Sequence, residues 1–191
     1  MSHPDHGPAL AREVRARTGI DPARCYQCGK CTAGCPMADE MPTPIQRIMR
    51  RLQRGDERLL ADVSLWYCLS CETCSARCPQ QVEPARLLDA LRELALEADK
   101  GAPPRNIRAF HEAFLEQIRW NGRLYEFGLV MGYKLRSAAL LDDVDAAPAM
   151  LARGKLAFVP RRIQGLDDIR RIFTACAQPV AREPAPEEEG R

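Results

Sequence analysis

The sequence predicts an all-α protein organised around two cysteine-rich runs. Apolar residues recur at helical spacing in several segments, and no segment has the convincing apolar–polar alternation of a half-buried strand. Eight of the nine cysteines gather in two runs of the same form. With 191 residues, the chain can hold one ordinary domain with extensions or two small domains.

Both runs have the spacing C-x2-C-x2-C-x3-C-P, the first from Cys25 to Pro36 and the second from Cys68 to Pro79. All four cysteines of the second run lie 43 positions after their counterparts in the first. This spacing is typical of two-cluster iron–sulfur proteins, in which three cysteines of a run bind one 4Fe-4S cluster and the fourth binds the other. The sequence therefore predicts two 4Fe-4S clusters.

The spacing also predicts how the ligands divide. Three cysteines at i, i+3 and i+6 on a tight turn can direct their sulfurs into one concavity, whereas the longer gap and the following proline carry the fourth away. We therefore expect crossed ligation, with a fold that depends on iron. One cluster takes Cys25, Cys28, Cys31 and Cys78, and the other takes Cys68, Cys71, Cys74 and Cys35.

Zinc is the alternative metal for these runs, because zinc also favours four thiolates, and the chain would then be a zinc-stabilised interaction module. Zinc ribbons pair two C-x2-C units, however, so a triplet followed by Cys-Pro favours clusters. The ninth cysteine, Cys176, lies on the apolar face of a predicted helix over 165–177. We expect it to be a small buried hydrophobic residue.

Three helices are expected in the first half of the chain. One covers 10–18 and ends at Gly19, and the next, over 43–54, joins the two cysteine runs. The third, over 83–99, carries leucines and alanines at amphipathic spacing. A shorter helical piece is expected at 56–62, before the second run.

Arginines line one side of the 43–54 helix. This stripe is either a solvated face or a docking surface for an acidic partner, and the sequence leaves both possibilities open. Its members are Arg47, Arg50, Arg51 and Arg54.

The clearest linker is Gly101 to Pro104. It divides a two-cluster domain, 1–100, from a helical extension, 101–178, and a proline- and glutamate-rich tail, 179–191, is expected to be disordered. Within the extension we expect helices over 105–120 and 165–177, a weaker helix within 123–141 that contains two glycines, and a loop over 142–148.

Charge and hydropathy limit the classes of partner and the compartment. The 28 basic and 26 acidic residues give a net charge of +2, which does not indicate nucleic-acid binding. The longest apolar stretch, 127–133, is too short for a membrane span, so no transmembrane segment is expected. The first residues lack the basic and apolar regions of a secretory signal, and we expect a reducing, cytoplasmic location.

Two such runs separated by helical residues resemble the alpha-helical ferredoxin fold. More specifically, the chain resembles the C subunit of heterodisulfide reductase. The segments that carry this resemblance are Cys25–Cys31, Trp66–Cys68, Phe110–Phe114, Asn121–Glu126, Val159–Leu166 and Ile169–Phe173.

The resemblance implies an electron-transfer subunit that relays electrons between a flavin- and cluster-bearing A-like subunit and a disulfide-reducing B-like subunit. It implies the eight cysteines of the runs as ligands, with the extension docking on partners. Related complexes also couple to hydrogenase or dehydrogenase modules. No catalytic residue is expected, because the chain has neither a Cys-Cys-Gly motif nor a G-x-G-x-x-G fingerprint.

The alternative within redox chemistry is the iron–sulfur subunit of a quinone-linked oxidoreductase, of the succinate dehydrogenase, fumarate reductase or glycolate oxidase type. Such a subunit often brings an N-terminal plant-type ferredoxin domain, and only 24 residues precede Cys25.

Overall fold

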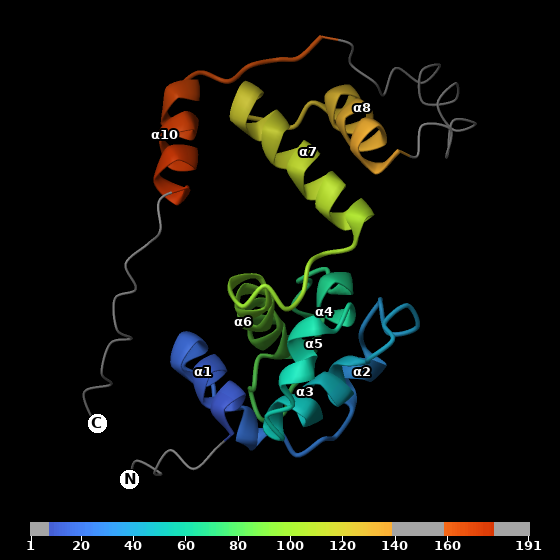
Figure 1. Ribbon diagram of the computed structural model, residues 1–191. Coiled ribbons are helices and arrows are strands. Elements are labelled where there is room, and N and C mark those ends of the chain that lie inside the picture. Colours follow the sequence, from blue (N-terminus) through green and yellow to red (C-terminus); the bar gives the residue numbers. More distant parts are fainter. Residues whose placement is uncertain (1–7, 139–158, 178–191) are drawn as a thin grey trace. The chain divides into compact units, whose positions relative to one another are not determined.

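The computed structural model describes residues 8–138 and 159–177. Within these residues every regular element is helical, with nine α-helices and two short 3-10 helices and no strand, so the predicted all-α class is confirmed (Figure 1). The expected loop at 142–148 and the expected disordered tail at 179–191 lie outside the described residues. In the part of the chain that the structure describes, no helix combines the length and the apolar character needed to cross a lipid bilayer.

The described residues divide into two compact units, 8–103 and 104–177. The first unit contains both cysteine runs. The helices expected over 10–18, 43–54 and 83–99 are present, with ends within two residues of those predicted. The α-helices of this unit are α1 (Ala9–Thr18), α2 (Lys30–Ala33), α3 (Ile45–Gln53), α4 (Ser64–Tyr67), α5 (Thr73–Ala76) and α6 (Pro84–Glu97), and the 3-10 helices are η1 (Pro22–Arg24) and η2 (Glu57–Ala61).

The core of the first unit is built mainly from α3 and α6. Their apolar residues recur at i, i+3, i+4 and i+7, so each helix turns one continuous face inward. The fully buried members of these faces are Ile48, Met49, Leu52, Leu87, Leu88 and Leu91. Cys74 is buried in this core and five other cysteines of the runs pack against it. Both cysteine runs are therefore held directly against the core.

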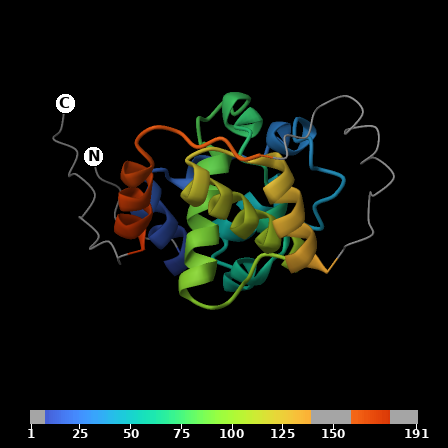
Figure 2. The same ribbon diagram turned by 90° about the horizontal axis from the view of Figure 1, so that it is seen from above.

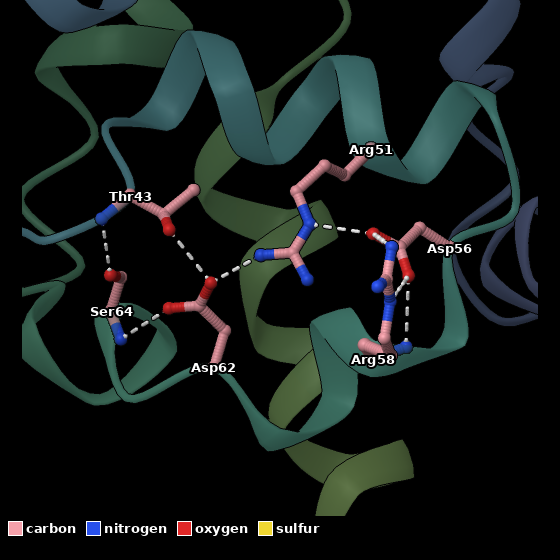
Figure 3. A network of polar contacts seen from close by, with 6 residues as sticks. All are labelled: Thr43, Arg51, Asp56, Arg58, Asp62 and Ser64. Atoms are coloured by element: carbon pink, nitrogen blue, oxygen red, sulfur yellow. Dashed lines mark hydrogen bonds and ion pairs between the residues drawn. The ribbon is translucent and has the colours of Figure 1, made fainter.

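The segment between the two runs is fixed by a polar network that surrounds Asp62 (Figure 3). Asp62 accepts hydrogen bonds from the Thr43 hydroxyl at 2.8 Å and from the Ser64 N–H at 3.0 Å, and it pairs with Arg51. The Thr43 N–H donates to the fully buried Ser64 hydroxyl at 2.8 Å. These contacts join the residues before α3 to the start of α4, which leads into the second run.

Arg51 also pairs with Asp56 at 3.0 Å, so its guanidinium bridges two carboxylates (Figure 3). It is therefore not part of an exposed stripe along α3. The other three arginines of the expected stripe, Arg47, Arg50 and Arg54, are exposed.

The second unit contains α7 (Arg105–Asn121), α8 (Glu126–Ser137) and α10 (Leu166–Cys176), in agreement with the helices expected there. Helix α7 lies between α10 and α8 in both views (Figure 1, Figure 2). The two glycines of α8 stand at its contact with α7. A Cβ at Gly132 would come within 3.3 Å of the Ala113 Cβ, and one at Gly128 would come within 2.5 Å of the Gln117 side chain. The glycines thus permit close packing.

Cys176, the last residue of α10, is exposed, so the prediction of a buried cysteine is wrong. The helix has the expected apolar face, but that face is only partly covered. Phe173 is half-buried and Ile172 is 57% exposed, and no residue of α10 is fully buried. Apolar periodicity defines a face and does not ensure that another element covers it.

Candidate iron-sulfur sites

The two cysteine runs adopt the same backbone conformation. The residue two positions after the first cysteine is left-handed in both, with φ of 66° at Gln27 and 49° at Ser70. The residue after the second cysteine is also left-handed, with φ of 80° at Gly29 and 59° at Glu72. A left-handed non-glycine residue costs about 1–2 kcal/mol. The tight turn of each run therefore stores some strain, least at the glycine.

Each run borders a small cavity, and each cavity is walled by cysteines from both runs. We name as site one the cavity lined by Cys25, Cys28, Cys31 and Cys78, and as site two the cavity lined by Cys35, Cys68, Cys71 and Cys74. With their open mouths included, the spaces measure about 340 and 300 Å³. The structure thus gathers the eight cysteines into the two sets of four that the spacing assigns. Their ligation of iron stays a prediction.

The sulfurs stand around an open space and do not converge on one point. Within residues 8–138 and 159–177, no group of three or more His, Cys, Asp or Glu side chains is placed to hold one metal ion. In a 4Fe-4S cluster each thiolate binds its own iron atom, so cysteines set around a cavity fit its ligand requirement.

The two sites are immediate neighbours. Pro84 and Ala85, the first residues of α6, line site one and site two respectively, and Gln46 and Ile45 of α3 do the same. The N-terminal end of α6, which carries the positive end of the helix dipole, therefore lies at both cavities. Between the runs, the Arg77 side chain packs over Gly34, where a Cβ would come within 2.4 Å of its guanidinium.

Polar groups contact sulfurs at both sites. At site one the Gln27 side-chain amide donates to Cys25 Sγ at 3.5 Å, and the Val82 N–H donates to Cys78 Sγ at 3.4 Å. At site two the Ser70 N–H donates to Cys68 Sγ at 3.5 Å. Donors of this kind stabilise charge on cluster sulfurs and raise the reduction potential.

The cysteine thiols differ in their acidity. Burial raises the pKa of Cys74 to about 11 and raises the pKa of Cys31. Hydrogen bonding with Thr73 lowers the pKa of the exposed Cys71. Because only thiolates bind iron, loading the buried positions must release protons and becomes easier at higher pH.

A network of glutamine amides supports the first run and was missed by the sequence reasoning. Gln46 donates to the Gln27 carbonyl at 2.8 Å, and Gln53 donates to the Cys25 carbonyl at 2.7 Å. Gln27 in turn donates to the Gln53 side chain at 3.0 Å. Gln46 and Gln53 lie seven residues apart on α3, on one helical face. That spacing, next to a cysteine run, was the signal available in the sequence.

The helical fold and the paired cysteine-walled cavities define the chain as a two-cluster iron–sulfur protein. Residues 22–82 match the family model of the 4Fe-4S dicluster domain. This match favours clusters over the zinc alternative, and the chain binds two 4Fe-4S clusters.

Among known proteins, the chain is similar to the C subunits of heterodisulfide reductases. It is 31% identical over 95 residues to the C subunit of H(2):CoB-CoM heterodisulfide,ferredoxin reductase from Methanothermobacter thermautotrophicus, covering 49% of this chain and 51% of that protein. It is 44% identical over 79 residues to the iron-sulfur C subunit of CoB–CoM heterodisulfide reductase from Methanopyrus kandleri, covering 40% of each. The chain spans about half the length of the curated relatives it matches.

Proposed function

We propose that this chain is the electron-transfer subunit of a heterodisulfide-reductase-like complex. It would relay electrons through two 4Fe-4S clusters between a flavin-containing A-like subunit and a disulfide-reducing B-like subunit. The observation that carries the proposal is the pair of adjoining cysteine-walled cavities, which share the first residues of α6 as a common wall. The similarity to the C subunits of heterodisulfide reductases supports it.

In this proposal the chain's residues hold, separate and insulate the clusters, which supply one-electron transfer when bound. Site one uses Cys25, Cys28, Cys31 and Cys78, and site two uses Cys68, Cys71, Cys74 and Cys35. Crossed ligation ties each run to the cluster of the other. The cytoplasm is the expected compartment, since thiolate ligands remain reduced there. Hydrogenase or dehydrogenase modules are candidate electron donors to such a complex.

The first experiment measures iron and acid-labile sulfide in anaerobically purified full chain, with EPR spectra before and after dithionite. We expect about eight iron atoms per chain and magnetically interacting reduced signals. Zinc in place of iron, or four iron atoms only, would contradict the two-cluster proposal.

Crossed ligation is tested by removing ligands in pairs. In a Cys28→Ala background, in which site one is impaired, Cys35→Ser should change the EPR spectrum of the remaining cluster and Cys78→Ser should leave it unchanged. The reciprocal Cys71→Ala background should reverse the result. Uncrossed ligation predicts the opposite outcome in both backgrounds, so the paired variants separate the two arrangements.

We also propose that the extension, 101–178, docks on the partner subunits. Its helix α7 exposes large apolar side chains, including Phe110, Leu115 and Trp120, the last of them 63% exposed. Exposed apolar residues of this kind are typical of interfaces.

To test the docking proposal, one variant carries Leu115→Ser and Trp120→Ser. The matched control is Arg119→Ala, at an exposed position of the same helix. Co-purification with tagged A-like and B-like subunits should be lost in the first variant and kept in the second. Full retention in both would refute docking through α7.

Electron transfer to a quinone analogue in place of the B-like subunit would favour the quinone-linked alternative.

A further inference from the structure

Sites one and two are built on the same backbone and carry different side chains. Six positions differ between the runs; two of these pair Thr32 with Ser75 and Gly34 with Arg77, and the other four lie in the turn that follows the first cysteine of each run. Paired by the offset of 43, these are Tyr26 and Leu69, Gln27 and Ser70, Gly29 and Glu72, and Lys30 and Thr73. Because the backbones correspond, the two sites form an internal comparison in which side chains are the main variable.

The largest difference is one of charge. Lys30 lines site one and Glu72 lines site two. Both are exposed, and within residues 8–138 and 159–177 neither takes part in a salt bridge. A cation near a cluster favours the added electron and an anion opposes it, since reduction adds negative charge. The two side chains therefore shift the potentials of their sites in opposite directions.

Other charged residues near the sites are paired with an opposite charge or lie between the two sites. Arg92 donates to the Cys68 carbonyl at 3.4 Å near site two, but it pairs with Asp89 at 3.3 Å. Glu83, which precedes the α6 residues at site one, pairs with Arg86 at 2.9 Å. Arg77 packs over Gly34 between the runs, next to one ligand candidate of each site, and does not discriminate between them.

Hydrogen bonds to sulfur act in the same direction as the charges. Site one has two donors to sulfur besides its lysine, the Gln27 side-chain amide and the Val82 N–H. Site two has one, the Ser70 N–H, whereas the Cys71 thiol donates to the Thr73 hydroxyl. The leucine that replaces Tyr26 in the second run offers no donor.

We propose that site one has the higher reduction potential, so that a single electron shared by the two sites rests mainly at site one. The inference rests on the two-cluster function proposed above. One electron that passes from site two to site one oxidises the group bound at site two and reduces the group bound at site one, with no bond or proton changed. Downhill flow thus runs from a low-potential one-electron donor docked over the exposed Cys71 to an acceptor docked over the exposed Cys28.

The test is an EPR-monitored redox titration of the anaerobically purified full chain, with Lys30→Thr and Glu72→Gln compared with the unaltered protein. Lys30→Thr places at site one the residue that the second run carries, so the backbone is compatible. We expect Lys30→Thr to lower the higher potential more than the lower one, and Glu72→Gln to raise the lower potential more than the higher one. Each should change the electron distribution about three- to tenfold, where tenfold corresponds to about 59 mV for one electron.

Two further variants separate charge from structure. Thr73→Lys should raise the lower potential, and Glu72→Gly should do so while also removing a left-handed non-glycine residue. Lys100→Thr is the control, because Lys100 follows the C-terminal end of α6, a helix of 14 residues and so about 20 Å long that begins at the two sites, and it pairs with Glu57 at the surface. It should leave both potentials unchanged.

Three results would overturn the inference: Lys30→Thr lowering the lower potential more than the higher one, Glu72→Gln raising the higher potential more than the lower one, or neither variant moving a potential more than Lys100→Thr does. These outcomes are distinct from failure of the proposed function. That failure appears as fewer than about eight iron atoms in the unaltered protein, before any titration.

Discussion

Replacing Asp62 by Ala should weaken the first unit more than any other single change in the polar network between the two runs. The substitution removes the acceptor for Thr43 and Ser64 and one of the two carboxylates that hold Arg51 (Figure 3). Hydrogen bonds to charged groups contribute about 1.5–3 kcal/mol each, but neighbouring contacts are not additive. We expect a loss of about 3 kcal/mol, because Arg51 keeps Asp56 and water can reach part of the site.

The assay is unfolding of the cluster-loaded chain in guanidinium under anaerobic conditions. Circular dichroism and the visible absorbance of the clusters are measured after the same incubation time for every variant. With a slope of about 3 kcal/mol/M, a 3 kcal/mol loss lowers the midpoint by about 1 M. Asp62→Asn keeps an acceptor for Ser64 and should shift the midpoint about half as far. Because unfolding releases iron, the midpoints are compared between variants and not converted into absolute stabilities.

The matched control is Arg58→Ala, which removes a pair with Asp56 that lies at the surface, where the Arg58 side chain is 88% exposed. Surface pairs contribute at most about 1 kcal/mol. If Asp62→Ala lowers the midpoint no more than Arg58→Ala does, the network does not hold the segment between the runs and the reasoning is wrong.

Three further predictions follow from individual side chains. Hydrogen bonds from Arg58 and Arg51 lower the pKa of Asp56 to about 2. The contribution of Asp56 to stability is therefore present above its unfolded pKa, near 3.9, and is lost as pH falls toward 2. The difference in urea midpoint between the unaltered protein and Asp56→Asn, measured by circular dichroism directly after the pH step, should shrink from pH 7 to pH 3, and a constant difference would contradict this assignment. Cys176→Ser should keep the full iron content because Cys176 lies in neither cavity, and loss of iron on elemental analysis would show a role that the structure does not indicate. Gly132→Leu should crowd Ala113 and destabilise the α7–α8 contact by about 1–3 kcal/mol. Limited proteolysis of the second unit should then be faster. Val130→Leu, at an exposed position of α8, should leave the rate of proteolysis unchanged.

The longer helices could be predicted because their signals are local. In α3 and α6 the apolar residues recur at one spacing, and prolines or glycines mark several of their ends. The division of cysteines between the two cavities also follows from local spacing, since the x3 gap separates Cys35 and Cys78 from the triplets that precede them. Properties that a short stretch of sequence sets by itself were therefore accessible.

The remaining features have no clear signal in the pattern of the sequence. Arg51 belongs to a regular arginine stripe in the sequence, and only Asp56 and Asp62 from the following segment remove it from the surface. The left-handed conformation of Gln27 and Glu72 has no signal in the sequence, because neither residue is a glycine. Helices of four residues, such as α2 and α5, are too short for periodicity to reveal.

The wall shared by the two sites limits how much charge the pair can store. Pro84 and Ala85 are consecutive residues, with Cα atoms about 3.8 Å apart, and each lines a different cavity. An electron held at one of two adjoining sites repels a second electron at the other, because the interaction between charges grows as their separation falls. In the relay proposed above, the second electron would therefore enter at a lower potential than the first, and between these two potentials the chain would carry one electron at a time.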